Sequence, residues 1–148
     1  MNVEIRVIPH PDQRYDTAGD WWWEGDTLHI RVSQFPESPA KARYEFLVAI
    51  HEYVEAMLCK FQGVSEADVD AWDLGPGAAM EDPGNDPRAP YHQQHKEGLL
   101  IEKLMAQALK LRWDTYEKQF DQLPAWKPDP RAATNHAKEI HDEPQETA

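Results

Sequence analysis

Residues 46–59 read FLVAIHEYVEAMLC, an apolar run interrupted by three ionisable side chains. The apolar positions follow helical spacing, so the segment predicts a long helix whose apolar face forms the main core contact. His51 and Glu55 lie four residues apart and share one face of this helix, whereas Glu52 is turned by about 100° around the axis. Burying these groups is costly unless something binds them, and a metal ion held by His51 and Glu55 meets that requirement.

A second polar pair lies on a second predicted helix, at about residues 91–111. His95 and Glu102 share one face of that helix but lie about 10.5 Å apart along its axis. Both could therefore bind one ion only if the ion lies between them and both side chains are extended. His95 is the firmer ligand, and Glu102 is either a fourth ligand or a partner that orients an imidazole. The alternative is a hydrogen-bonded or solvated polar seam between two helices. The predicted metal ligands are His51, Glu55, His95 and Glu102, and the predicted catalytic base is Glu52.

Strand patterns precede the long helix. Residues 20–24 and 27–32 are strand-like and flank Gly25-Asp26, which predicts a hairpin turn. A further half-buried strand is predicted at residues 3–8, because apolar and polar side chains alternate there. Its apolar residues are Val3, Ile5 and Val7. The expected fold is α+β, with a small N-terminal antiparallel sheet or hairpin followed by two main helices that carry the metal site.

The segment between the two ligand helices is long and rich in proline and glycine. Ser65 predicts the N-cap of a short helix that ends near Trp72. The remaining loop, residues 73–90, is long for a small domain, and such loops are usually functional or mobile. We therefore expect this loop to be placed where it could cover the site.

Composition limits the classes of partner and compartment. The 148 residues predict one domain, and 27 acidic against 15 basic side chains give a net charge of −12. Such a charge argues against nucleic-acid or anionic-membrane partners, since phosphate contacts need clustered Lys and Arg. The sequence contains neither a transmembrane segment nor a secretory signal, so a cytoplasmic protein is expected. The single cysteine, Cys59, is expected to be a small buried hydrophobic residue rather than a nucleophile.

The domain is expected to span residues 1–127. Prolines, charges and few large apolar groups predict a flexible acidic C-terminal tail at 128–148. His136 and His141 lie in that tail without apolar neighbours, and we assign them no role.

The His51-Glu52-x-x-Glu55 pattern resembles the HExxH helix of the zincins. It departs from that family at Glu55, which stands where zincins have a second histidine, although a carboxylate oxygen is still a good Zn²⁺ ligand. The run at 83–91, just before His95, is similar to small uncharacterised proteins of bacteriophages and prophages. This second similarity extends over roughly residues 18–116. The similarity to phage proteins implies no known activity. The zincin resemblance and the order of the predicted elements imply a minimal zincin-like core in which a later helix completes the ligand set.

The zincin resemblance implies a small metal-dependent, peptidase-like hydrolase of phage type that acts on an unknown peptide or protein in the host cytoplasm. Glu52 would take a proton from water polarised by the ion. Zn²⁺ is the first expectation, with Mn²⁺ or Fe²⁺ as alternatives because a carboxylate replaces an imidazole. The alternative function is a non-catalytic acidic phage interaction or inhibitor protein whose metal or polar seam is structural. The sequence does not reveal the oligomeric state.

Overall fold

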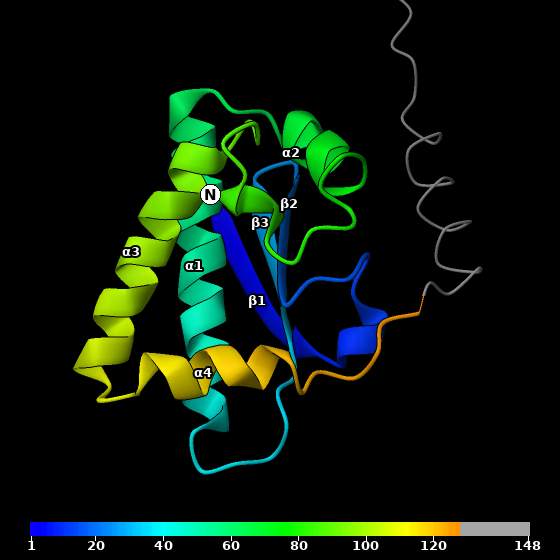
Figure 1. The fold of residues 1–148 in the computed structure, drawn as a ribbon. Coiled ribbons are helices and arrows are strands. Elements are labelled where there is room, and N and C mark those ends of the chain that lie inside the picture. The colour runs from blue at the N-terminus through cyan, green and yellow to red at the C-terminus, as the bar shows by residue number, and fades with distance from the viewer. Residues whose placement is uncertain (128–148) are drawn as a thin grey trace, which may run out of the picture.

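The computed structural model describes residues 1–127; the predicted tail at 128–148, with His136 and His141, lies outside the described residues. Within residues 1–127 a three-stranded sheet is followed by four helices, which confirms the α+β prediction (Figure 1). Two short 3-10 turns, η1 and η2, interrupt the loops. The elements are β1 (Asn2–Ile8), η1 (His10–Asp12), β2 (Gly19–Glu24), β3 (Thr27–Ser33), α1 (Lys41–Gln62), α2 (Glu66–Asp73), η2 (Pro83–Asn85), α3 (His92–Ala108) and α4 (Trp113–Phe120).

The sheet is mixed rather than wholly antiparallel. β2 and β3 form the predicted antiparallel hairpin, in which Glu24 pairs with Thr27. β1 pairs with the other edge of β3 in parallel, from Asn2 opposite Thr27 to Ile8 opposite Ser33. The chain reverses between β1 and β2 and reverses again in the hairpin, so β3 runs in the same direction as β1. The strand order β1-β3-β2 leaves β1 and β2 as the two edges.

The core lies between the sheet and α1. Leu28, Ile30 and Val32 of β3 are fully buried, as their alternation predicts, and Trp21 of β2 is buried beside them. α1 packs across β2 and β3 and ends at Gly63, which adopts a left-handed backbone conformation with φ 75°. This packing holds the ionisable face of α1 against the sheet edge formed by β2.

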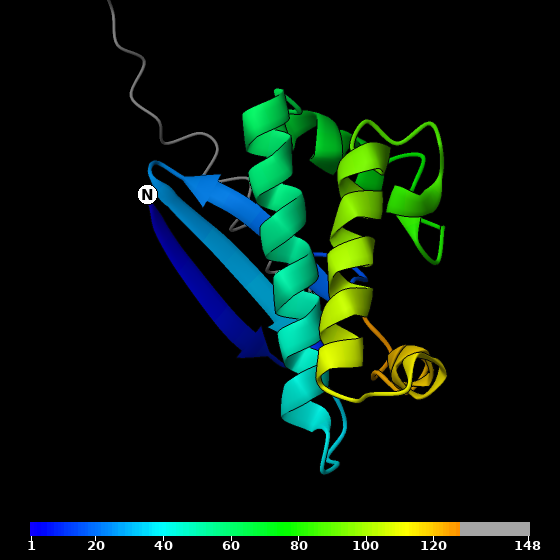
Figure 2. The same cartoon turned by 90° about the vertical axis from the view of Figure 1, so that its left-hand side faces the viewer.

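The prediction of a half-buried β1 is wrong. Val3, Ile5 and Val7 are 40%, 50% and 48% exposed. They pair with the buried residues of β3 and so point to the same face of the sheet. α1 makes its main sheet contacts with β2 and β3, and β1 extends beyond the helix (Figure 2).

α3 runs beside α1 along much of its length (Figure 2). A side chain added at Gly98 of α3 would lie 3.3 Å from the backbone oxygen of His51, so glycine permits the close approach of the two helices at this level. The second ligand helix ends earlier than predicted, because Lys110 takes a positive φ of 56° and the chain turns into α4. α4 crosses the lower part of α1 and buries Tyr116 (Figure 1).

Two further predictions can be compared with the structure. Ser65 caps α2, since its hydroxyl accepts a hydrogen bond from the Asp68 N–H at 3.1 Å. Cys59 is fully buried, and burial together with the nearby charge of Glu55 raises the pKa of its thiol to about 12. This agrees with a hydrophobic role for Cys59. Among the described residues, no helix combines the length and hydropathy needed to span a membrane.

Candidate metal centre

Three side chains from α1 and α3 converge on one point. His51 Nε2 lies 3.3 Å from Glu55 Oε2 and 3.1 Å from His95 Nδ1, and the last two atoms are 2.9 Å apart. Ligand atoms bonded tetrahedrally to Zn²⁺ at about 2.0–2.1 Å lie about 3.3 Å from one another. The three atoms therefore already form a triangle close to the size that a divalent ion requires.

Each imidazole of the cluster is oriented by a carboxylate on its other nitrogen. His51 Nδ1 lies 2.8 Å from Glu102 Oε2, and His95 Nε2 lies 3.1 Å from Asp82 Oδ1. Glu102 is held in turn by Tyr116, whose hydroxyl donates to its other oxygen. Carboxylates in this position fix the tautomer and orientation of metal-binding histidines. Once its facing nitrogen is deprotonated, each ring would present a lone pair toward the common point.

The carboxylate of Glu55 is also held from behind. The indole N–H of Trp21 donates to Glu55 Oε1 at 3.0 Å, while Oε2 faces the two imidazoles. Trp21 comes from β2, so the sheet edge positions this candidate ligand. All three ligands therefore have a supporting partner, which is typical of metal centres and is unusual for a chance polar seam.

The loop between α2 and α3 closes one side of the cluster. Gly84 of η2 packs directly against the ring of His95, so that any added side chain would collide with the imidazole. The same loop supplies Asp82, the partner of His95. The expectation that this loop covers the site agrees with these contacts.

The convergence shifts the pKa values of all three groups. Burial alone would lower the pKa of His95, but its hydrogen bonds to Asp82 and Glu55 outweigh that effect and raise the pKa to about 9. Burial would likewise lower the pKa of His51, yet its hydrogen bonds to Glu102 and Glu55 hold that pKa well above the ordinary value. The two imidazoles lower the pKa of Glu55 to about 2 against the effect of its own burial. The metal-free cluster is therefore a tightly paired set of opposite charges.

We expect the metal-induced rise in melting temperature to grow between pH 6.5 and pH 9. An ion binds neutral imidazole and must displace protons, so its affinity increases as pH approaches the pKa of about 9 of His95. Without metal, the raised imidazole pKa values stabilise the fold fully below the unfolded pKa of about 6.5, and this contribution is lost toward pH 9. Thermal unfolding with a buffered metal concentration measures both effects, and a metal shift that shrinks with pH would contradict the assignment.

Glu102 and Glu52 occupy different places from the three converging ligands. Glu102 lies on the far side of the His51 ring, with both oxygens engaged by His51 and Tyr116. Of the two roles that the sequence leaves open, this position favours support of an imidazole. Glu52 lies against Gly19 of β2 and borders the same cleft as the three ligands.

Replacing Glu102 by glutamine is expected to weaken metal binding about 10-fold to 100-fold without abolishing it. Glutamine retains the shape and one acceptor but removes the charge that supports the His51 ring. Metal titration by calorimetry measures the change, and Tyr116→Phe should shift affinity in the same direction by less. If Glu102→Gln instead loses the ion completely, as expected for loss of a direct ligand, then Glu102 belongs to the coordination sphere.

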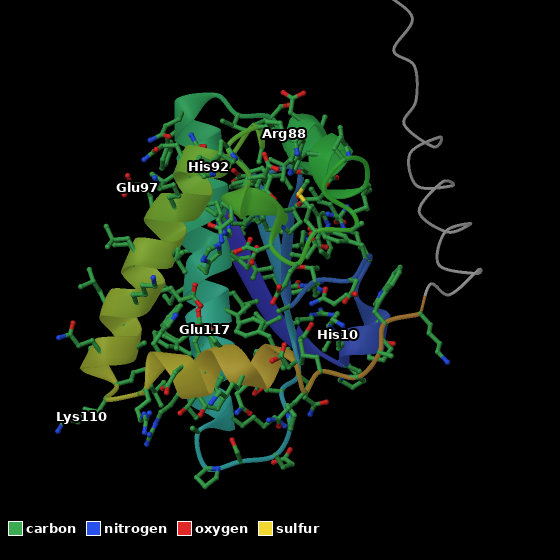
Figure 3. All side chains as sticks on the ribbon, in the orientation of Figure 1. His10, Arg88, His92, Glu97, Lys110 and Glu117 are labelled. Carbon is green, nitrogen blue, oxygen red and sulfur yellow. The ribbon has the colours of Figure 1, made fainter. Side chains whose placement is uncertain are left out.

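The cluster borders an open cleft of about 1260 Å³. Its walls come from β2 and the loop before it, α1, the loop between α2 and α3, α3 and α4. His10 of η1 and Glu117 of α4 also line it, and Figure 3 labels both, whereas Glu97 and Lys110 point outward along the outer side of the molecule. The cleft gives a molecule in solution access to the three ligands.

Several other polar side chains of the chain lie outside the cluster. Asp73 is buried and accepts hydrogen bonds from Tyr15 and Tyr91, and Asp70 pairs with Arg14. His92 contacts the backbone oxygen of Gly84, and His29 stacks on Trp22 on the opposite face of the sheet.

Comparison of the chain with protein-family models, with curated proteins and with solved structures finds no match. The zincin and phage resemblances therefore remain hypotheses. Any function has to be argued from the residues of the cluster and its cleft.

Proposed function

We propose that the protein is a small metal-dependent hydrolase of peptidase-like type. The observation that carries this proposal is the convergence of His51 Nε2, Glu55 Oε2 and His95 Nδ1 within an open cleft. Three protein ligands leave a coordination position free, as in catalytic rather than structural zinc sites. A divalent ion held there would supply Lewis acidity for attack by water on a carbonyl group.

Glu52 is the proposed base of this reaction. It lies next to the ligand His51 in sequence, is turned away from the ligand face of α1 and lies against β2 at the cleft. Burial and the neighbouring charge of Glu55 raise the pKa of Glu52 well above its ordinary value. That direction suits a group that accepts a proton from water near neutral pH and returns it to a leaving group.

A purely structural metal in an acidic interaction protein is the alternative. That alternative expects a closed site with four protein ligands. Glu102 is the remaining candidate for a fourth ligand from the sequence, and both of its oxygens are already engaged by His51 and Tyr116. The position of the cluster in a cleft also favours chemistry over a role that only links α1 to α3.

Zn²⁺ is the first ion that we propose for the site, because two imidazoles and one carboxylate are common ligands of catalytic zinc. Mn²⁺ and Fe²⁺ also accept such ligand sets. We further propose that the substrate is a peptide or protein and that the protein acts in the cytoplasm of a phage host, in keeping with the resemblances of its sequence.

A peptide-library assay tests the activity. The protein is loaded with Zn²⁺, Mn²⁺ or Fe²⁺, incubated with a proteome-derived peptide library, and the new peptide ends are identified by mass spectrometry. We expect cleavage that depends on the ion and stops on chelation. Metal binding without any cleavage, for all three ions, would favour the structural alternative.

A further inference from the structure

β1 is an edge strand that exposes an apolar row. The row consists of Val3, Ile5 and Val7, and each of these side chains is at least two-fifths exposed. They point to the same face of the sheet that α1 covers at β2 and β3. Within residues 1–127, β1 pairs with β3 alone, so the backbone groups of its other edge are open to a further strand. A seven-residue edge of this kind, without proline, readily accepts a partner strand.

The opposite edge of the sheet is shielded. The backbone N–H of Trp23 in β2 donates to Glu66 Oε2 at 2.7 Å, so a side chain of α2 occupies one backbone donor of that edge. β2 also borders the cleft through Gly19 and Trp21. In the described part of the chain, β1 is the edge whose backbone makes no such side-chain contact, and it lies on the side away from the candidate metal centre (Figure 2).

The sequence of β1 is complementary to itself when the strand is reversed. In an antiparallel pair centred on Ile5, that residue faces its own copy and Val3 faces Val7. Glu4 then faces Arg6 of the other copy on the opposite side of the sheet, twice. Opposite charges directly across an antiparallel pair are favourable and like charges are unfavourable.

Neighbouring registers match the side chains of the two copies less well. A shift of two residues in one direction places Glu4 opposite its own copy, and a shift in the other direction does the same to Arg6. A shift of one residue brings apolar and charged side chains together across the pair. The register centred on Ile5 is therefore the one that matches both faces.

We propose that two copies of this chain associate through β1, antiparallel and centred on Ile5, to form a continuous six-stranded sheet. The strand carries one acidic and one basic side chain, Glu4 and Arg6, so the contact is locally neutral although each chain has a net charge of −12. Arg6 is 64% and Glu4 36% exposed, and Arg6 Nε pairs with Glu4 Oε1 at 3.0 Å within one chain, so association would exchange this pair for the pairs across the contact. The two apolar rows would lie next to each other between the two α1 helices. Such a two-fold contact closes the open edge and leaves both clefts accessible.

The oligomeric state of the full chain tests this association. Sedimentation velocity at micromolar concentration is expected to give a dimer for the wild type. Ile5→Lys should raise the dissociation constant about 100-fold or more, because the substitution acts twice at the centre of the contact. Leu74→Lys, at another exposed apolar residue, is the matched control and should leave the dimer intact. A wild type that is monomeric throughout, or an Ile5→Lys variant that dimerises normally, would overturn the proposal.

Charge exchange tests the register. Glu4→Lys places four basic side chains across the contact, and Arg6→Glu places four acidic ones, so each variant alone should be monomeric. An equimolar mixture restores every opposite-charge pair and should form a heterodimer. Circular dichroism confirms that each variant is folded, which matters because Glu4 also pairs with Arg31 within the chain. A mixture that stays monomeric would contradict this register.

Discussion

Replacing His51 by alanine is expected to remove the metal, abolish hydrolysis and lower the melting temperature strongly. The imidazole supplies one ligand through Nε2 and pairs with Glu102 through Nδ1. Its removal leaves buried carboxylates at Glu55 and Glu102 without a main partner, and breaking buried pairs of this kind typically costs about 3–5 kcal/mol. Loss of the ion removes a further contribution to stability, since a ligand of the native state favours folding.

Elemental analysis and thermal unfolding of the same samples measure this effect. His29→Ala is the matched control, because His29 stacks on Trp22 on the other face of the sheet and takes no part in the cluster. It should keep the ion and its thermal shift. An unchanged metal content in His51→Ala would show that the ion, if present, is bound elsewhere.

Replacing Glu52 by glutamine should reduce hydrolysis about 10²-fold to 10⁴-fold, the usual contribution of a positioned general base. The metal content should remain that of the wild type, because none of the three converging ligand atoms belongs to Glu52. Glutamine preserves the size of the side chain but cannot accept the proton. If the variant loses the ion as fully as His51→Ala, then Glu52 is a ligand and the catalytic proposal fails.

A second variant addresses the position of the same carboxylate. A side chain added at Gly19 of β2 would collide with the carboxylate of Glu52, so Gly19→Ala is expected to displace it. Activity should fall while the ion is retained. Normal activity in Gly19→Ala would show that the placement of Glu52 against β2 is not needed for the reaction.

The centre of the site could be predicted from the sequence because it depends on local periodicity. The spacing of His51 and Glu55 within an apolar run places both on one face of a helix, whatever packs against that helix. His95 was predicted from a second pattern of the same kind, and it converges with them in the structure. For Glu102 the spacing left two roles open. The distance between two residues along a helix does not show whether a carboxylate contacts the ion or the other nitrogen of a neighbouring imidazole.

The supporting partners could not be predicted in this way. Asp82 lies in an irregular loop, and no periodicity indicates that it meets His95. Trp21 is a buried residue of β2, and no spacing within that strand indicates that its indole N–H orients Glu55. These contacts arise from packing between elements, which the spacing of residues within one element does not define.

β1 shows a further limit of sequence patterns. Alternation at Val3, Ile5 and Val7 correctly predicts a strand with one apolar face, but it does not reveal whether another element covers that face. α1 packs mainly on β2 and β3, so the row remains partly exposed in one copy of the chain. The predicted burial would be recovered if two copies pair through β1.

The metal content of the purified protein tests the central claim most directly. The wild type purified without chelator, or reloaded with Zn²⁺ and desalted, should contain about one divalent ion per chain by elemental analysis. The same treatment of His51→Ala should give none. A wild type without an ion, combined with no thermal shift on adding Zn²⁺, Mn²⁺ or Fe²⁺, would contradict a metal centre at His51, Glu55 and His95.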